Sequence, residues 1–263
     1  MSQWRKALSD WSHGLGAWGI WLHYGIADIR KQYKRTFLGP VWAGVSAAIF
    51  VFTFAYVGSE LFANDARSYV NYLAVGYILY NFLVSNTLEF CSAFNNSENL
   101  LNNGPLPRSV PLLRTWVKNL LALAHTLPVI ALVALVSGND SVLVFHALLG
   151  LLVFLLFTFL FGVIAALLNL RYRDTHVALS NVFMITFFMT PVLWRRNGLP
   201  EAKQFIVDYN PIAQLLDLVR MPVAEGTAAS AWAWHVSLVT IAAVALVAAW
   251  LFVIWRRKVT YWL

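Results

Sequence analysis

The sequence has little charge for its length and a single cysteine. Of its 263 residues, 60% are hydrophobic and 12% are charged. A water-soluble domain needs far more charge to cover its surface, so this composition excludes one soluble core and indicates a membrane protein. Because Cys91 has no second cysteine to pair with, no disulfide forms within the chain. The first forty residues lack a short apolar core followed by small residues, so we expect no cleavable signal peptide.

Long apolar runs make up most of the chain. Crossing about 30 Å of hydrocarbon takes about 20 helical residues, and six runs approach that length. They lack the strict alternation of a membrane β-strand, so we expect an all-α integral membrane protein with six transmembrane helices. The runs cover residues 41–62, 70–90, 116–136, 142–168, 177–194 and 234–255.

Motifs that bind nucleotides or metals are missing. No Gly-Lys dipeptide occurs, so the phosphate-binding loop G-x-x-x-x-G-K-[ST] is absent and we expect no ATP hydrolysis by this chain. The six histidines have no partner at the spacing of a zinc or haem site. His125, inside the third run, is expected to hydrogen-bond to a neighbouring helix. We therefore predict a protein that is not an enzyme and holds no metal or cofactor of its own.

The basic residues are unevenly distributed. Fourteen of the nineteen lysines and arginines lie in segments that share a side with the N-terminus if the chain crosses six times. Positive residues concentrate on the cytoplasmic side of membrane proteins, so we expect both termini in the cytoplasm. The net charge of +7 is thereby explained by topology, and no nucleic-acid partner is expected.

An amphipathic segment precedes the first run. Apolar residues recur every three or four positions from Trp11 to Phe37, which is the period of a helix. Its charged faces predict a helix that lies flat at the cytoplasmic membrane surface, either as a topology anchor alone or also in contact with substrate or partner. Gly39 and Pro40 are expected to end it and to start the first transmembrane helix. This divides the chain into an interface segment, 1–39, and a transmembrane domain, 40–263.

The segment 195–233, between the fifth and sixth runs, is long and is divided by three prolines. A loop of this length without structure is uncommon, so we expect two short helices, at 199–208 and 212–219. Their apolar residues suit a re-entrant helical hairpin that neighbouring protein protects from lipid, and an interfacial hairpin is the alternative.

Four motifs occur in order along the chain: DIRKQYKRTFLGPVW at 28–42, NLRYRD at 169–174, TPVLW at 190–194, and Asn210-Pro211 followed by Arg220. Together they resemble ABC-2 type polysaccharide-export permeases, above all those that move lipid-linked O-antigen. The resemblance implies the transmembrane subunit of an ATP-driven exporter in the bacterial inner membrane. Its substrate would be a polysaccharide on undecaprenyl diphosphate. The implied partners are a second copy of the chain, which completes a channel, membrane lipids, and two copies of a cytoplasmic ATPase that holds ATP and Mg.

The resemblance also implies roles for particular residues. Basic side chains beside the headgroups would capture the carrier diphosphate, and a short segment from Glu98 to Arg108 would seat in the ATPase. The substrate entrance would comprise Arg30, Lys34 and Arg35, and the ATPase contact would comprise Glu98, Asn99, Arg108, Arg173 and Asp174. The channel wall would include Trp42, Phe50, Phe187 and Trp194. The outer gate would be formed by Pro200, Asn210, Pro211 and Arg220.

Other functions stay open at this point. Capsule and teichoic acid exporters share the same plan. A small-molecule ABC-2 exporter would not need the broad basic segment. An intramembrane enzyme acting on polyprenyl phosphates would need clustered carboxylates or histidines at one membrane face, and the sequence shows no such cluster.

Overall fold

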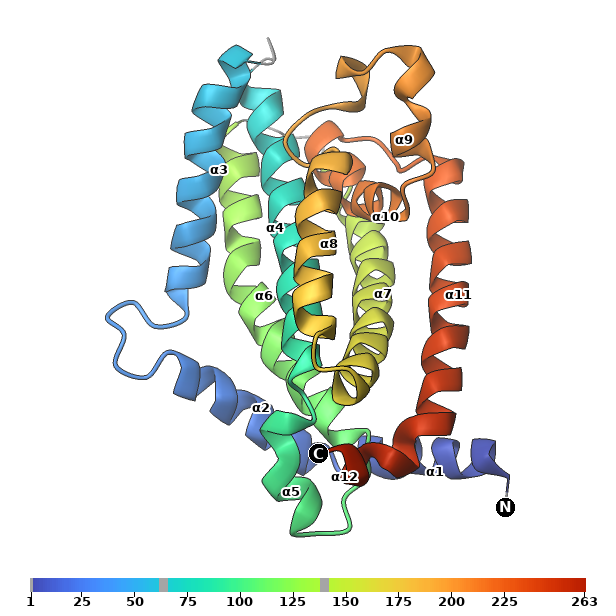
Figure 1. The fold of residues 1–263 in the computed structure, drawn as a ribbon. Coiled ribbons are helices and arrows are strands. Elements are labelled where there is room, and N and C mark those ends of the chain that lie inside the picture. The colour runs from blue at the N-terminus through green and yellow to red at the C-terminus, as the bar shows by residue number, and fades with distance from the viewer. Residues whose placement is uncertain (1, 62–65, 138–141) are drawn as a thin grey trace.

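The computed structural model describes residues 2–61, 66–137 and 142–263, and the regular elements in these ranges are helices. Six long helices stand side by side as a bundle (Figure 1). They fall where the six apolar runs predict them, although the end of the first run, at residue 62, lies outside the described residues. These helices are α3 (Val41–Leu61), α4 (Ala66–Cys91), α6 (Val110–Val136), α7 (Val144–Arg171), α8 (Thr175–Met189) and α11 (Ala231–Trp255).

By length and composition, four segments in the described part of the chain qualify as membrane spans: Val41–Gly58, Val110–Val136, Val144–Arg171 and Ala231–Trp262. Helix α8 is apolar but has only 15 residues. Helix α4 has 26 residues, but its apolar character is diluted by asparagine and tyrosine. Several of these polar groups are buried, among them Asn71, Asn86 and Thr87, because α4 lies inside the bundle.

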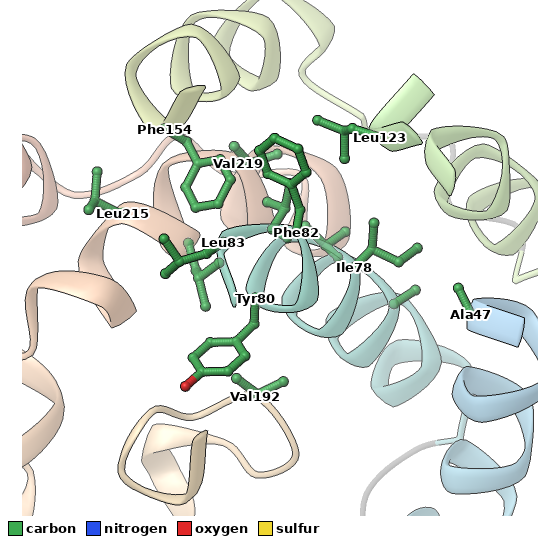
Figure 2. Packing of buried hydrophobic residues seen from close by; sticks show 14 of the residues in the cluster. Ala47, Ile78, Tyr80, Phe82, Leu83, Leu123, Phe154, Val192, Leu215 and Val219 are labelled. Atoms are coloured by element: carbon green, nitrogen blue, oxygen red, sulfur yellow. The ribbon is translucent and has the colours of Figure 1, made fainter. Parts of the chain in front are cut away.

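Helix α4 forms the centre of the fold and packs against α3, α6, α7 and α8. Its residues Ile78, Leu83 and Phe82 meet Phe154 of α7 and Leu123 of α6 in the largest apolar cluster (Figure 2). Burying such side chains contributes about 1.5–3 kcal/mol each in water. Within a membrane, close packing and hydrogen bonds between helices provide the corresponding stabilisation.

Two helices lie across the bundle at one end, where α5 (Glu98–Asn102) also lies (Figure 1). They are α1 (Gln3–Gly16) and α2 (Trp18–Gln32), and η1 (Asn95–Ser97), η5 (Arg256–Lys258) and α12 (Val259–Trp262) complete what we call the α5 end. The prediction of one helix from Trp11 to Phe37 was wrong, because the chain forms two helices that meet at Ala17, and the second ends before Phe37. The helix ends at Gln32 because the chain turns at Tyr33 to Thr36, and Arg35 there has a φ of 68°.

The opposite end, called the α9 end, carries the segment between α8 and α11. Helix α10 (Pro211–Arg220) confirms the second expected short helix and packs against α4, α7 and α11. The first expected helix, 199–208, was wrong in extent, because the Lys203 amide bonds to the Pro200 carbonyl in a single tight turn. The remaining elements are η2 (Arg196–Gly198), η3 (Glu201–Lys203), α9 (Phe205–Asp208) and the π-helical turn η4 (Met221–Glu225).

Candidate functional site

The predicted substrate-entrance residues lie where α2 turns toward α3. Arg30 is on the last turn of α2, and Lys34 and Arg35 follow in the turn. All three side chains are exposed, and none forms a hydrogen bond or ion pair with another described residue. Three unpaired cations therefore stand within six positions of one another, which is a suitable arrangement for binding a multivalent anion.

A neighbouring acid in the same motif is already paired. The Arg114 guanidinium of α6 donates to both carboxylate oxygens of Asp28, at 2.6 and 2.8 Å. Arg114 also donates to the Asn96 carbonyl at 3.1 Å and to the Ser97 hydroxyl at 3.2 Å. One side chain thus joins α2 to the segment that leads into α5.

Close backbone approach supports this junction. A Cβ on Gly25 would lie 3.0 Å from the Arg114 carbonyl oxygen and 3.1 Å from the side chain of Val117. Glycine therefore lets α2 lie directly on α6. Sequence reasoning selected neither Gly25 nor Arg114, because a lone glycine and a lone arginine on different elements show no joint pattern.

The predicted ATPase-contact residues occupy two links at the α5 end. Glu98 and Asn99 are exposed at the start of α5, while Leu101 is buried and holds α5 against the second apolar cluster. Arg173 and Asp174 are exposed in the link between α7 and α8. Helix α5 and the link between α7 and α8 lie toward the same end of the bundle (Figure 1), so a partner protein at this end has access to these four exposed residues.

Arg108 lies in a different place from the other four predicted ATPase-contact residues. It lies beyond α5, and its backbone amide donates to Asp10 of α1 at 3.1 Å. The Ser109 amide donates to the other Asp10 oxygen at 3.0 Å. Arg256 of η5 lies 3.6 Å from Asp10 and also bonds to the Lys6 carbonyl. Asp10 therefore anchors α1 between the end of the α5 link and the chain after α11.

The second link is positioned by a residue of its own motif. The Asn169 amide donates to the Cys91 carbonyl at the end of α4, at 2.8 Å, and its oxygen accepts the His176 backbone amide at 3.1 Å. Asn169, the first residue of the NLRYRD motif, therefore has a structural role, because it joins this link to the end of α4.

The two motifs of the α9 end meet in space. Asn210 caps α10 by accepting the amides of Ile212 and Ala213, and it donates to the Thr190 hydroxyl at 3.0 Å. At the other end of α10, Arg220 donates to the Pro191 carbonyl and to Asp217. Both ends of α10 therefore hold the turn that follows α8.

Arg220 is buried, with 1% of its surface exposed. Its guanidinium lies 4.0 Å from the centre of the Tyr72 ring of α4, and the Tyr72 hydroxyl also donates to the Pro191 carbonyl, at 3.0 Å. Arg220 and Asn210 thus anchor the predicted outer gate, whereas Pro200 is exposed on the loop above it. Tyr72 was missed because a tyrosine in an apolar run is equally typical of packing.

The predicted channel-wall residues are spread along two helices. Phe50 of α3 stacks on Tyr77 of α4 with ring centres 3.9 Å apart, and Phe187 of α8 packs on Tyr80 of α4 at 5.3 Å. Phe50 and Phe187 therefore flank the same stretch of α4 from two helices. The two tryptophans lie apart from them: Trp42 is 44% exposed at the start of α3, and Trp194 follows α8 at the other end.

Trp194 borders a cavity of about 700 Å³ at the α9 end, together with Phe188, Arg195 and Leu199. Its indole donates to the Phe188 carbonyl at 3.1 Å. Above this cavity, Asp208 accepts two bonds from Arg196, both at 2.8 Å, and these bonds raise the pKa of the Arg196 guanidinium.

The described residues offer few groups that could bind a metal ion or act in catalysis. They contain no group of three or more histidines, cysteines or acids that could hold a metal ion. His125 lies 2.6 Å from the Leu121 carbonyl through Nδ1, so its bond is within α6, and the expected bond to a neighbouring helix was wrong. In a helix, this carbonyl one turn earlier is the nearest acceptor.

Comparison with known proteins agrees with the motifs. The family model described as "ABC-2 type transporter" matches residues 25–223. Two curated proteins from Klebsiella pneumoniae, each named "O-antigen export system permease protein RfbA", are 26% identical over 192 residues, which is 72% of this chain and 74% of theirs. A protein of the same name from Myxococcus xanthus is 22% identical over 194 residues, with the same shares covered.

Proposed function

Because this chain belongs to the ABC-2 type transporter family, we propose that it is the membrane subunit of an ATP-driven exporter that moves undecaprenyl-diphosphate-linked O-antigen polysaccharide across the bacterial inner membrane. The observation that carries this proposal is the similarity of 72% of the chain to proteins named as O-antigen export permeases. ATP hydrolysis falls to a separate subunit that binds ATP and Mg, since the sequence has no G-x-x-x-x-G-K-[ST] loop.

In this proposal the chain crosses the membrane six times and has both termini in the cytoplasm. Helix α4 crosses in the interior, where neighbouring helices rather than lipid meet its buried Asn71 and Asn86. The apolar length of α8 is extended by the buried Pro191 and Val192. Helix α10 enters the membrane from outside and is shielded by α4, α7 and α11. The α5 end then faces the cytoplasm, and residues 1–39 form the interface segment beside the transmembrane domain, 40–263.

The export path is formed by two copies of the chain. On α8 and α3, large apolar side chains are exposed, among them Met184, Phe188, Phe52 and Tyr56. A surface of this kind needs lipid or another protein as its neighbour. We place the partner copy and the channel there, with Phe50 and Phe187 in its wall, Trp42 and Trp194 toward its ends, and the α10 segment as the outer gate.

The α5 end is where ATP hydrolysis is coupled to the membrane subunit in this proposal. Two ATPase subunits contact α5 and the link between α7 and α8, where Glu98, Asn99, Arg173 and Asp174 are accessible. Arg108 holds the α5 link through Asp10. On the neighbouring surface, the unpaired Arg30, Lys34 and Arg35 bind the diphosphate of the carrier, as basic residues at a membrane surface bind lipid phosphates.

The test is to purify the chain alone and with the ATPase encoded beside it, and to measure ATP hydrolysis and the mass of the complex. We expect no hydrolysis by the chain alone, a complex of two plus two subunits, and faster hydrolysis when lipid-linked O-antigen is added. Lipid-linked capsule polymer and teichoic acid serve as comparison substrates.

Hydrolysis by the chain alone, or failure to form a complex, would contradict the role as a membrane subunit. Stimulation by drugs combined with indifference to glycan would instead support a small-molecule exporter. A stronger response to capsule or teichoic acid than to O-antigen would keep the transport role and change the substrate.

A further inference from the structure

A cavity of about 230 Å³ lies between the end of α2 and helices α3, α4 and α6. Four apolar side chains of its wall, Ala47, Ile78, Phe82 and Leu123, belong to the main apolar cluster (Figure 2). The rest of the wall is mostly polar. Along α4 it extends from Glu89, near the α5 end, to Asn81, which is about 12 Å deeper at 1.5 Å per residue.

Several polar groups of the wall, which lie nearer the α5 end than Asn81, have hydrogen-bond partners within the protein. The Lys118 ammonium donates to the Glu89 carboxylate at 2.6 Å, which neutralises the one cation of the wall. The Asn119 amide donates to the Asn86 oxygen at 2.9 Å, and Asn86 donates to the Thr158 carbonyl at 2.9 Å. These groups are held rigidly and carry no net charge.

Two other polar residues of the wall have no protein partner. Asn81 and Ser85 lie four residues apart on one face of α4 and line the cavity with exposed side chains. Neither side chain forms a hydrogen bond with another described residue. A polar side chain at this depth of an apolar bundle is unfavourable unless it has a hydrogen-bond partner. Because both side chains are exposed, a ligand or water in the cavity can reach them as this partner.

The chemistry of the wall defines the ligand. A phosphate would need an unpaired cation, and Lys118 is already paired with Glu89. Amide and hydroxyl groups both donate and accept, so they match a neutral ligand that carries several hydroxyl groups. The partly exposed ring of Tyr33 adds an aromatic face to the same wall. A sugar ring has this combination of hydroxyl groups and apolar faces.

The position of the cavity indicates which sugar residue of the polymer it would bind. Gln32 and Tyr33 line it, and the unpaired cations Arg30, Lys34 and Arg35 flank these two residues in the chain. A diphosphate held by the cations places the group bonded to it beside the opening. We infer that this cavity binds the sugar residue joined directly to the carrier diphosphate. The inference rests on the proposed function and adds a neutral site next to the anionic one.

The experiment measures binding to the full chain assembled with its ATPase in lipid nanodiscs. Two probes are compared: undecaprenyl diphosphate, and undecaprenyl diphosphate that carries one N-acetylhexosamine. The variant Asn81→Leu/Ser85→Ala removes the unpaired groups, and His146→Leu makes a similar polar-to-apolar change at an exposed α7 position outside the cavity. We expect the unaltered protein to bind the sugar-bearing probe about tenfold more tightly, which is the size expected from two neutral hydrogen bonds.

The double variant should lose this preference and bind both probes with the affinity that the unaltered protein has for the bare carrier, while His146→Leu keeps the preference. A preference that survives in the double variant would overturn the inference, as would an equal loss for both probes. Equal binding of the two probes by the unaltered protein would mean that the cavity holds water alone. Failure of the unaltered protein to bind either probe would instead overturn the proposed function and the inference with it.

Discussion

The Arg114 guanidinium donates hydrogen bonds to both oxygens of the Asp28 carboxylate and also to the Asn96 carbonyl and the Ser97 hydroxyl. Asp28 belongs to the basic segment of α2, and Ser97 directly precedes α5. Charge-assisted bonds thereby connect α5, the proposed ATPase contact, to the place proposed for the lipid diphosphate. The planar fork of arginine can make all of these bonds together, and an ammonium group cannot.

The first prediction concerns this connection. Arg114→Lys keeps the charge but loses the fork, so the increase in ATP hydrolysis on adding lipid-linked O-antigen should fall about tenfold, equivalent to about 1.4 kcal/mol. Arg257→Lys, at an exposed position on the same end, is the control and should respond normally. Assembly of the complex should be unchanged in both variants. A full response by Arg114→Lys would show that the junction is only structural.

The second prediction concerns the buried Arg220. Arg220→Met leaves Asp217 without its donor and the Pro191 carbonyl with Tyr72 as its donor, and breaking a buried pair in this way costs about 3–5 kcal/mol. The thermal unfolding midpoint in detergent should fall sharply. Adding Asp217→Leu to Arg220→Met removes the unpaired carboxylate and should restore part of the loss. Equal midpoints for the unaltered protein and the single variant would refute the anchoring role of Arg220.

A third prediction compares two glycines. A Cβ on Gly150 of α7 would lie 2.2 Å from the Leu218 carbonyl oxygen of α10, whereas a Cβ on Gly19 of α2 would meet no atom within 4 Å. Gly150→Ala must push α10 away and should destabilise the protein by about 1–3 kcal/mol. Gly19→Ala should be neutral or stabilising by up to about 1 kcal/mol, because alanine favours the helix. Thermal midpoints of the two variants provide the comparison, and equal midpoints would argue against close packing of α10 on α7.

The fourth prediction concerns the unpaired cations. Replacing Arg30 and Lys34 together by glutamine should weaken binding of undecaprenyl diphosphate by about fivefold per charge. The affinity should also become less sensitive to salt, because fewer charges are left to screen. Lys203→Gln removes an exposed charge at the α9 end and should have no effect. An unchanged affinity in the double variant would place the diphosphate elsewhere.

Much of the helical arrangement could be predicted from residue order. Runs of apolar residues predicted the positions of six long helices, and Asn210-Pro211 predicted the start of α10, because a side-chain cap followed by proline is a local signal. Boundaries that depend on a turn were less predictable. The end of α2 at Gln32 is set by the backbone at Arg35, and no apolar period reveals a change of φ.

In the candidate sites as well, local motifs were predictable from the sequence, and contacts between distant segments were not. Motifs identified Asn210 and Arg220, but their common target, the Thr190-Pro191 segment, was not predictable, and neither was the part played by Tyr72. Arg114 and Gly25 carry no motif at all. Their importance comes from the contact of α2 with α6, between residues far apart in the chain.

By itself, the sequence determined that this is an apolar, helical membrane protein with an uneven charge distribution and without a nucleotide-binding loop, because composition and periodicity act on each segment separately. Tertiary structure decided that Arg220 is an anchor, that Arg114 joins two elements, and that Asn81 and Ser85 open into a cavity. These properties depend on which helices meet, and a hydrogen bond or an unpaired polar group exists only once two segments are brought within about 3 Å of each other.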